Sequence, residues 1–131
     1  SRAVVLLQYT FDYKEAEKRY IEVPVSRNTR IVDVRTIQYI EKRRNQCVLH
    51  CTDAEITCYE TLKKICSKLD QNIFIYVHQG YIVNFDAIKE VKENVVCLGD
   101  GVEVPLSRSH YKEVKNRHMS KIRKLLEERK M

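Results

Sequence analysis

From residue 21 to residue 106 the chain is divided into short apolar stretches, each separated from the next by a few polar turn residues. In the first stretch, Ile21, Val23 and Val25 alternate with other residues. This period of two places every second side chain on the same face of a β-strand. Residues 37–41 alternate in the same way. A long helix does not fit this pattern, so most of the chain is expected to form short strands.

Turn residues mark where these strands are expected to reverse direction. Polar turns at 26–29, 42–45 and 52–55 predict reversals, and Gly99-Asp100-Gly101 predicts another. β-branched and aromatic residues, which favour strands, are concentrated between the turns. The strands expected after Val25 cover residues 30–32, 37–41, 47–51, 56–59, 73–78, 83–88, 91, 95–98 and 102–106.

Two segments predict helices instead. Leu62, Ile65, Cys66 and Leu69 follow the spacing i, i+3, i+4 and i+7, which indicates an amphipathic helix of about three turns. A last helix is expected to begin near Ser107, a residue type favoured at N-caps. Its apolar stripe consists of Tyr111, Val114, His118, Ile122 and Leu125. The expected fold is therefore mainly β, with one short internal helix and a C-terminal helix.

Positive charge is concentrated at the C-terminal end of the chain. Residues 1–105 carry 15 basic and 15 acidic side chains, whereas residues 106–131 carry nine basic and three acidic ones. The formal net charge of +6 therefore lies entirely in the second segment. Such a segment suits a polyanionic partner such as nucleic acid, although basic helices are also common as solvated surface.

The cysteines do not predict a disulfide framework or a zinc site. There are five, an odd number, and none forms a CxxC pair. The best metal candidate is the group Cys47, His50 and Cys51. In a strand, His50 points to the face opposite the two cysteines, so one ion could not easily bind all three. We expect no metal site, and interpret the cysteines as small buried hydrophobic residues.

Enzymatic motifs are also missing from the sequence. Gly80, Gly99 and Gly101 fit neither of the glycine-rich motifs that bind phosphate groups. No cysteine lies in a recognisable nucleophile motif, and no pair of carboxylates has a spacing that suggests acid–base catalysis. We therefore predict no catalytic residues and no cofactor.

The N-terminal stretch does not suggest membrane insertion. The longest apolar run, residues 3–7, is far shorter than the roughly 20 residues of a membrane-spanning helix. It also lacks the flanking features of a signal peptide. We therefore expect a soluble, cytoplasmic protein that does not associate with membranes.

Three segments supply the side chains that DNA recognition requires, namely cations for phosphates and polar groups that reach base edges. They are the turn at 42–45, the bend at 78–79 that follows a buried strand, and the junction at 107–108. Taken singly, each also fits a solvated turn. The candidate DNA-contacting residues are Lys42, Arg43, Arg44, Asn45, His78, Gln79 and Arg108.

The order of several segments carries a family resemblance. Residues 37–41 read IQYIE, residues 74–88 read FIYVHQGYIVNFDAI, and residues 104–108 read VPLSR. Over roughly residues 21–118 the chain resembles the LytTR family of bacterial DNA-binding domains, which are usually the output halves of two-component response regulators. The resemblance implies an elongated assembly of small β-sheets whose loops enter successive major grooves. The turn at 42–45, the bend at 78–79 and Arg108 would be the groove-entering groups.

Other positions would have structural roles in such a domain. Asn84 is expected to bond its own turn. At the bend, the chain has Tyr76 and Gln79 where many family members have arginine. Glutamine suits adenine and arginine suits guanine, so we expect weaker dependence on guanine where Gln79 meets the DNA. The expected core residues are Ile37, Tyr39, Ile40, Leu62, Leu69, Phe74, Ile82, Val83 and Ile88.

The complete prediction is a sequence-specific transcriptional regulator with 21–118 as its DNA-binding domain. Residues 1–20 would be a linker or docking segment, such as the tail of an upstream receiver domain, and 119–131 a basic helical extension. The resemblance implies double-stranded DNA as partner, in paired direct repeats, and a dimer on the DNA. The alternative is a protein-interaction module that binds an acidic partner through exposed β edges and the basic helix.

Overall fold

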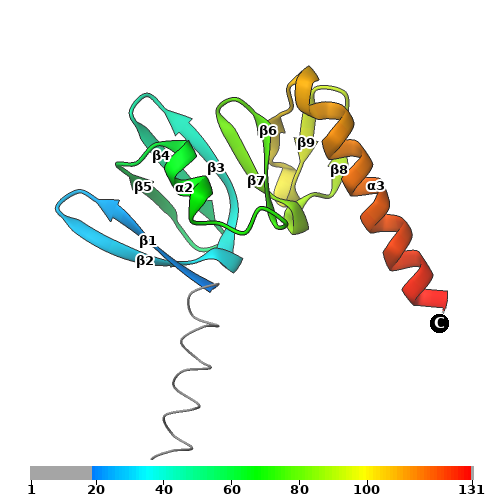
Figure 1. Cartoon of the computed structure of the whole chain (residues 1–131), viewed down its shortest axis with the longest axis horizontal. Helices are drawn as coiled ribbons and strands as arrows, with labels where there is room; N and C mark the ends of the chain where they lie inside the picture. Colours follow the sequence, from blue (N-terminus) through cyan, green and yellow to red (C-terminus); the bar gives the residue numbers. More distant parts are fainter. Residues whose placement is uncertain (1–18, 131) are drawn as a thin grey trace, which may run out of the picture.

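The computed structural model describes residues 19–130. Ten strands, two α-helices and three short 3-10 helices follow one another along this part of the chain, and Figure 1 shows their arrangement. In chain order they are β1 (Tyr20–Val25), β2 (Asn28–Asp33), η1 (Val34–Thr36), β3 (Ile37–Arg43), β4 (Gln46–Cys51), β5 (Glu55–Cys58), α2 (Leu62–Ser67), β6 (Phe74–His78), β7 (Tyr81–Asn84), η2 (Phe85–Ala87), β8 (Glu90–Val91), β9 (Val95–Cys97), η3 (Gly99–Gly101), β10 (Glu103–Pro105) and α3 (Arg108–Lys130). The predicted linker at 1–20 lies almost wholly outside the described residues.

The strands form three antiparallel sheets, arranged in a row along the long axis of the molecule (Figure 1). The first is the β1–β2 hairpin, the second has the order β5-β4-β3-β7-β6, and the third has the order β10-β9-β8. The mainly β prediction is confirmed, and so is the elongated assembly of small sheets.

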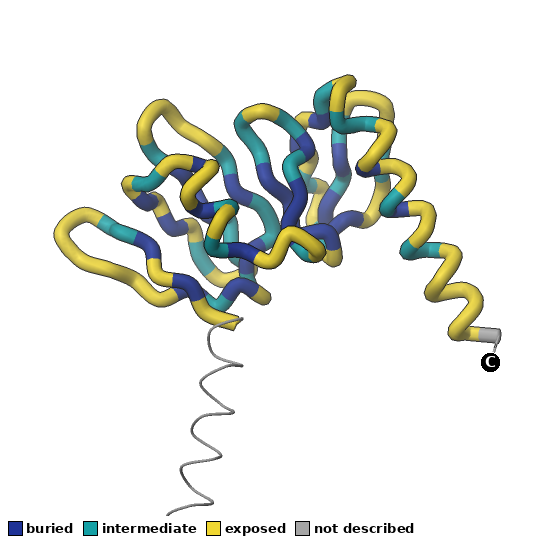
Figure 2. The backbone as a smooth tube through the Cα atoms, viewed as in Figure 1, coloured by how far each residue is buried: buried dark blue, intermediate teal, exposed yellow. Residues whose placement is uncertain are grey.

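The five-stranded sheet separates two hydrophobic cores, because neighbouring residues of its strands point to opposite faces. Ile82 packs in the first core, with α2 and the β1–β2 hairpin. Val83, the next residue, packs in the second core, with the three-stranded sheet and Val114 of α3. Figure 2 shows buried backbone on both sides of this sheet. Of the nine predicted core residues, all are buried except Tyr39, which is half-buried at the edge of the second core.

A β-bulge explains why the simple alternation predicted for residues 37–41 is wrong. The register of β3 against β4 shifts between Ile37 and Tyr39. As a result Ile37 and Ile40, three residues apart, both lie in the first core. An extra residue on one strand changes which face the following side chains occupy.

Of the two helices, α3 has its expected extent, beginning directly after Ser107, whereas α2 is shorter than predicted. Instead of about three turns, α2 has only the six residues Leu62–Ser67. The Thr61 hydroxyl accepts from the Lys64 amide at its start, and at its end the Ser67 hydroxyl donates to the Lys64 carbonyl. After it, the amides of Ile73 and Phe74 donate to the Asp70 carbonyl in the turn that leads into β6. Leu69 lies beyond the end of α2 but is buried, as Leu62 and Ile65 of the helix are. The apolar spacing of a helix therefore continues in the sequence past the point where the helix ends.

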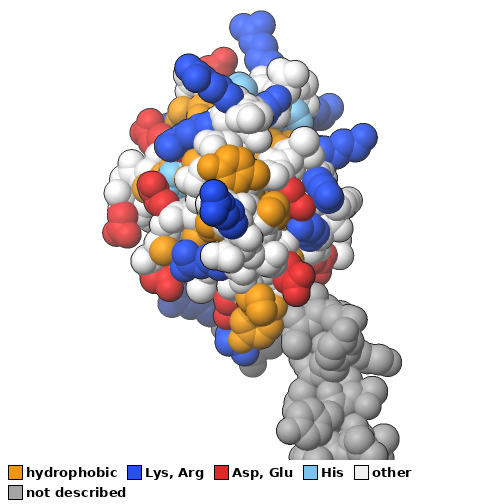
Figure 3. Space-filling view, turned by 90° about the vertical axis from the view of Figure 1, so that its left-hand side faces the viewer, with side chains coloured by type: hydrophobic (Ala, Val, Ile, Leu, Met, Phe, Trp, Pro, Cys, Tyr) orange, Lys and Arg blue, Asp and Glu red, His pale blue; other side chains and the backbone are white. Residues whose placement is uncertain are grey.

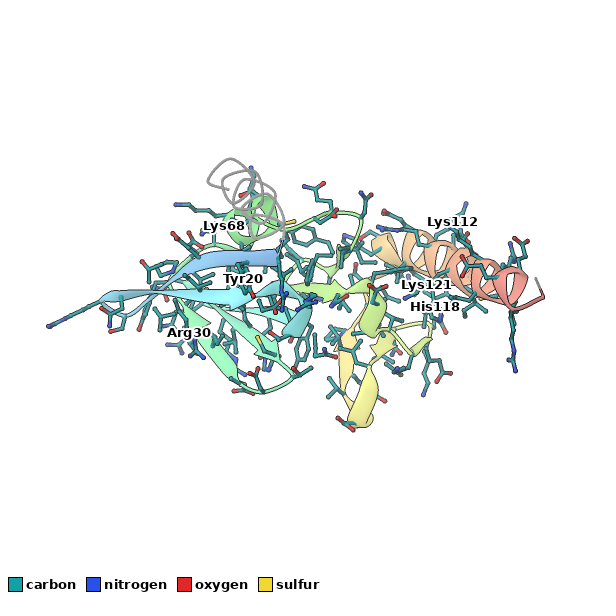
Figure 4. All side chains as sticks on the ribbon, turned by 90° about the horizontal axis from the view of Figure 1, so that it is seen from below. Tyr20, Arg30, Lys68, Lys112, His118 and Lys121 are labelled. Atoms are coloured by element: carbon teal, nitrogen blue, oxygen red, sulfur yellow. The ribbon has the colours of Figure 1, made fainter. Side chains whose placement is uncertain are left out.

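The apolar stripe of α3 is covered over only part of its length. Val114 and His118 are buried, but Leu125, which the sequence assigned to the same stripe, is 54% exposed. The helix has 23 residues and extends past the sheets (Figure 1). In Figure 4, His118 and Lys121 lie on the side of α3 toward the three-stranded sheet, and Lys112 lies on the other side. None of the helices described between residues 19 and 130 combines the length and apolar character needed to span a membrane.

Candidate nucleic-acid interface

The first predicted segment, 42–45, closes the β3–β4 hairpin. Lys42 and Arg43 end β3, and the pairing of Arg43 with Gln46 leaves Arg44 and Asn45 as a two-residue turn. Arg44 has a φ of 55°, in the left-handed region that tight hairpins need. All four side chains are exposed, so the hairpin presents three cations and one amide to solvent.

The second segment is the bend between β6 and β7. The amide of Gly80 donates to Nδ1 of His78 over 3.0 Å, and the imidazole packs edge-on against Tyr81 at 5.4 Å between ring centroids. Because Nδ1 accepts this bond, the neutral ring carries its proton on Nε2 and can donate from that atom. Gln79 is exposed at the tip of the bend, and no side-chain hydrogen bond holds it among those of the described residues.

The third segment joins β10 to α3. The amide of Ser107 donates to the Val77 carbonyl over 2.9 Å, which fixes the junction beside β6. Ser107 immediately precedes α3 as predicted, and its hydroxyl bonds Nδ1 of His110 over 2.6 Å. Arg108, the first residue of the helix, is exposed.

Hydrogen bonds between backbone groups bring the three segments together. The amide of Lys42 donates to the Gly80 carbonyl over 2.8 Å, which joins the first to the second, and the Ser107–Val77 bond joins the second to the third. A cavity of about 450 Å³ lies between the bend and the start of α3, lined by Tyr76, His78, Gln79, Ser107, Ser109 and His110. We call the row formed by residues 42–45, 78–79 and 108 the loop edge.

Figure 1 shows the β3–β4 turn, the β6–β7 turn and the start of α3 along the upper side of the molecule. Viewed from the end in Figure 3, lysine and arginine side chains project from this upper side, and carboxylates are more frequent lower down. The loop edge therefore combines positive charge with exposed side chains that can donate to and accept from bases.

One feature of the loop edge was not predicted from the sequence. Nη2 of Arg43 lies 2.7 Å from Oε1 of Glu41, and the same oxygen lies 2.6 Å from Nε2 of His50. Glu41 and His50 are on different strands, so their proximity depends on the β3–β4 register. Sequence spacing gave no signal for this contact.

The cysteines and histidines do not gather into a metal site in the part of the chain that the structure describes. Cys47 is buried in the first core, and His50 lies on the other face of the sheet, stacked on Tyr39. All five cysteines are free. Burial raises the pKa of the Cys47 thiol to about 11, which keeps it protonated and unreactive at neutral pH.

Comparison with known proteins identifies the family. A model of the LytTr DNA-binding domain matches residues 27–119. The chain is 30% identical over 106 residues to the sensory transduction protein LytT of Bacillus subtilis, covering 76% of this chain and 44% of that protein. It is 32% identical over 72 residues to the transcriptional regulatory protein LytR of Staphylococcus aureus, covering 51% of this chain and 29% of that protein. The chain thus spans less than half the length of these relatives.

A solved structure shares the fold. The LytTr DNA-binding domain of a Bacillus cereus response regulator superposes with a TM-score of 0.64 at 20% sequence identity, covering 78% of this chain and 97% of that one. The family match spans most of the chain and includes all three segments of the loop edge. The chain therefore belongs to the LytTR family of DNA-binding domains.

Proposed function

We propose that this chain recognises specific DNA sequences through its loop edge, as the output domain of a two-component response regulator. The observation that carries the proposal is that three polar, mostly basic segments from distant parts of the sequence form one row, linked by the Lys42–Gly80 and Ser107–Val77 backbone bonds. A row of this kind can follow one face of a duplex and place a different loop in each successive major groove.

The side chains of the loop edge have complementary tasks in this proposal. Arg43, Arg44 and Arg108 provide guanidinium groups, which bind phosphates or the O6 and N7 atoms of guanine. Gln79 can pair with adenine through two hydrogen bonds, and His78 can donate from Nε2. Lys42 and Asn45 extend the contact to the phosphate backbone.

The rest of the regulator is proposed from the relatives. Their names describe sensory transduction and transcriptional regulation, and each is more than twice as long as the segment it shares with this chain. We propose a receiver domain joined through residues 1–20, a DNA-binding domain at 21–118 with a basic extension at 119–131, and action in the cytoplasm. Two copies would occupy paired direct repeats, with phosphorylation of the receiver domain promoting their pairing.

Selection of duplexes from a random pool tests the central proposal. We expect one short motif to be enriched, and the chain to bind it about a thousandfold more tightly than random DNA. Arg108→Ala should weaken binding to the selected duplex without lowering the free energy of unfolding. Lys63→Ala is the control, because it removes a cation from α2 that is also exposed but lies outside the loop edge. Enrichment of no motif, with weak and steeply salt-dependent binding, would overturn the proposal.

A second candidate function rests on the far half of α3. Leu125 and Leu126 are 54% and 52% exposed, and residues 121–130 around them carry five lysines and arginines and two glutamates. This half of the helix runs away from the side of the molecule that carries the loop edge (Figure 1). Exposed leucines with flanking cations suit an acidic protein partner. If binding of such a partner were the main function, Leu125→Ala would abolish transcriptional regulation in cells. Arg108→Ala would leave that regulation unchanged.

A further inference from the structure

A chain of side-chain contacts ends at Arg43, one of the cations of the loop edge. Oε1 of Glu41 lies 2.7 Å from Nη2 of Arg43. The Glu41 side chain is only 14% exposed, whereas that of Arg43 is 57% exposed. A shielded carboxylate thus holds the guanidinium of a largely exposed side chain, and one such contact leaves other N–H donors of the guanidinium for a further partner.

Glu41 is itself held from the other side. Nε2 of His50 lies 2.6 Å from the same Glu41 oxygen, and Nδ1 of His50 lies 3.2 Å from Oε1 of Glu55. The imidazole is stacked on Tyr39, with 4.1 Å between ring centroids and 8° between planes. These contacts limit the rotation of the Glu41 carboxylate and fix the point to which Arg43 is bound.

We propose that Glu41 is a positioning residue that sets the sequence selectivity of the loop edge by holding Arg43 in one orientation. The proposal rests on the DNA-binding function proposed above. A free arginine on a hairpin tip samples many rotamers and can bind any nearby phosphate, which adds affinity without selectivity. Bound to Glu41, Arg43 keeps donors in a fixed plane, as a two-point contact to guanine requires.

The carboxylate also acts through its charge. Each cation that neutralises a phosphate adds to binding that does not depend on sequence. Because Glu41 offsets the charge of Arg43, it lowers affinity for random DNA more than affinity for a sequence with a base in the matching position. Both effects increase the ratio of the affinity for the specific sequence to the affinity for random DNA.

The test compares the Kd of the full chain for the selected duplex with its Kd for a random duplex, at one salt concentration. Glu41→Gln should raise affinity for random DNA and lower the ratio of specific to random binding by about tenfold. Glu41→Asp keeps the charge but shortens the side chain by one methylene, and should also lower the ratio. The control is Glu22→Gln, which removes an exposed carboxylate from β1 and should leave the ratio unchanged.

A double-mutant cycle with Arg43→Ala gives the second readout. If Glu41 acts through Arg43, Glu41→Gln should have no further effect on the ratio once Arg43 is alanine. Equal ratios for Glu41→Gln, Glu41→Asp and Glu22→Gln would overturn the inference, and so would independent effects of the Glu41 and Arg43 substitutions. Failure of the DNA-binding proposal itself is distinguishable, because the unsubstituted chain would then prefer no duplex.

Discussion

The side-chain amide of Asn84 donates to the carbonyl of Ile37 over 2.9 Å, joining residues 47 positions apart in the chain. The same side chain accepts from the amide of Asp86 over 3.0 Å and so caps η2. Asn84 is buried, and it connects β3 and β7, the strands that adjoin the first two segments of the loop edge. Its predicted turn bond is confirmed, and the bond to Ile37 gives it a second structural role.

Replacing Asn84 should therefore destabilise the fold. Asn84→Ala leaves the buried Ile37 carbonyl without its partner and removes the η2 cap, at an expected cost of about 2–3 kcal/mol in the free energy of unfolding. Denaturant titration measures this loss. Asn94→Ala is the control, since Asn94 is exposed in the β8–β9 turn and should change stability by less than about 0.5 kcal/mol. Equal stability of the two variants would contradict a structural role for Asn84.

Gln79 should determine one position of the DNA target. Gln79→Arg replaces a group suited to adenine with one suited to guanine, so the selected motif should change from adenine to guanine at a single position. Repeating the selection from a random pool with this variant measures the change. Gln71→Arg adds the same charge at an exposed position between α2 and β6, and should leave the motif unchanged. An unaltered motif with Gln79→Arg would show that Gln79 does not contact a base.

Acid should destabilise the packing of α3 through His118. Burial, with a smaller effect from nearby Lys121, lowers the pKa of His118 below its ordinary value of 6.5. Its Nδ1 is buried without a hydrogen-bond partner among the described residues. Between about pH 6.5 and the lower folded pKa, the unfolded chain binds a proton that the folded chain does not, so stability falls as pH falls.

The slope of this loss cannot exceed about 1.4 kcal/mol per pH unit for one proton. Unfolding free energies measured at several pH values from 7.5 to 5 give the slope. His118→Leu should remove this part of the pH dependence, because leucine fills a similar buried space without a titratable group. If the variant and the unsubstituted chain lost stability in parallel, His118 would not be the group responsible.

The two halves of α3 should respond differently to truncation of an apolar side chain. Val114 is 1% exposed in the second core, so Val114→Ala should cost about 2 kcal/mol of stability. Leu125 is 54% exposed, and Leu125→Ala should cost less than about 0.5 kcal/mol. Thermal unfolding of both variants measures the difference. A large loss with Leu125→Ala would mean that the far half of the helix is packed in solution.

Local patterns predicted most of the strands because each turn and each alternation is encoded within a few residues. The hairpin turns at 44–45 and 26–27 are examples, each at the expected place. Features that depend on distant partners were predicted less well. The bulge after Ile37 is set by pairing with β4, and α2 ends early because the chain must turn into β6.

In the candidate site, too, local features were predicted and features that depend on distant partners were not. Cations and amides in turns are visible in the sequence, and the resemblance grouped them in advance of any structure. Their alignment depends on backbone bonds such as that between Lys42 and Gly80, 38 positions apart, which no local pattern encodes. The contact between Glu41 and His50 likewise requires the strand register. Exposure of Leu125 could not be read from helical periodicity, because periodicity does not tell where the covering sheet ends.

The placement of one sheet between two cores has a consequence for how the domain unfolds. Ile82 and Val83 are adjacent in β7 but belong to different cores. Unfolding of either core would therefore expose one face of the five-stranded sheet, which carries two of the three loop-edge segments. Neither half of the domain can then melt by itself while the other persists. Folding should be a single cooperative transition, and partly unfolded chains that retain only some of the DNA contacts should not accumulate.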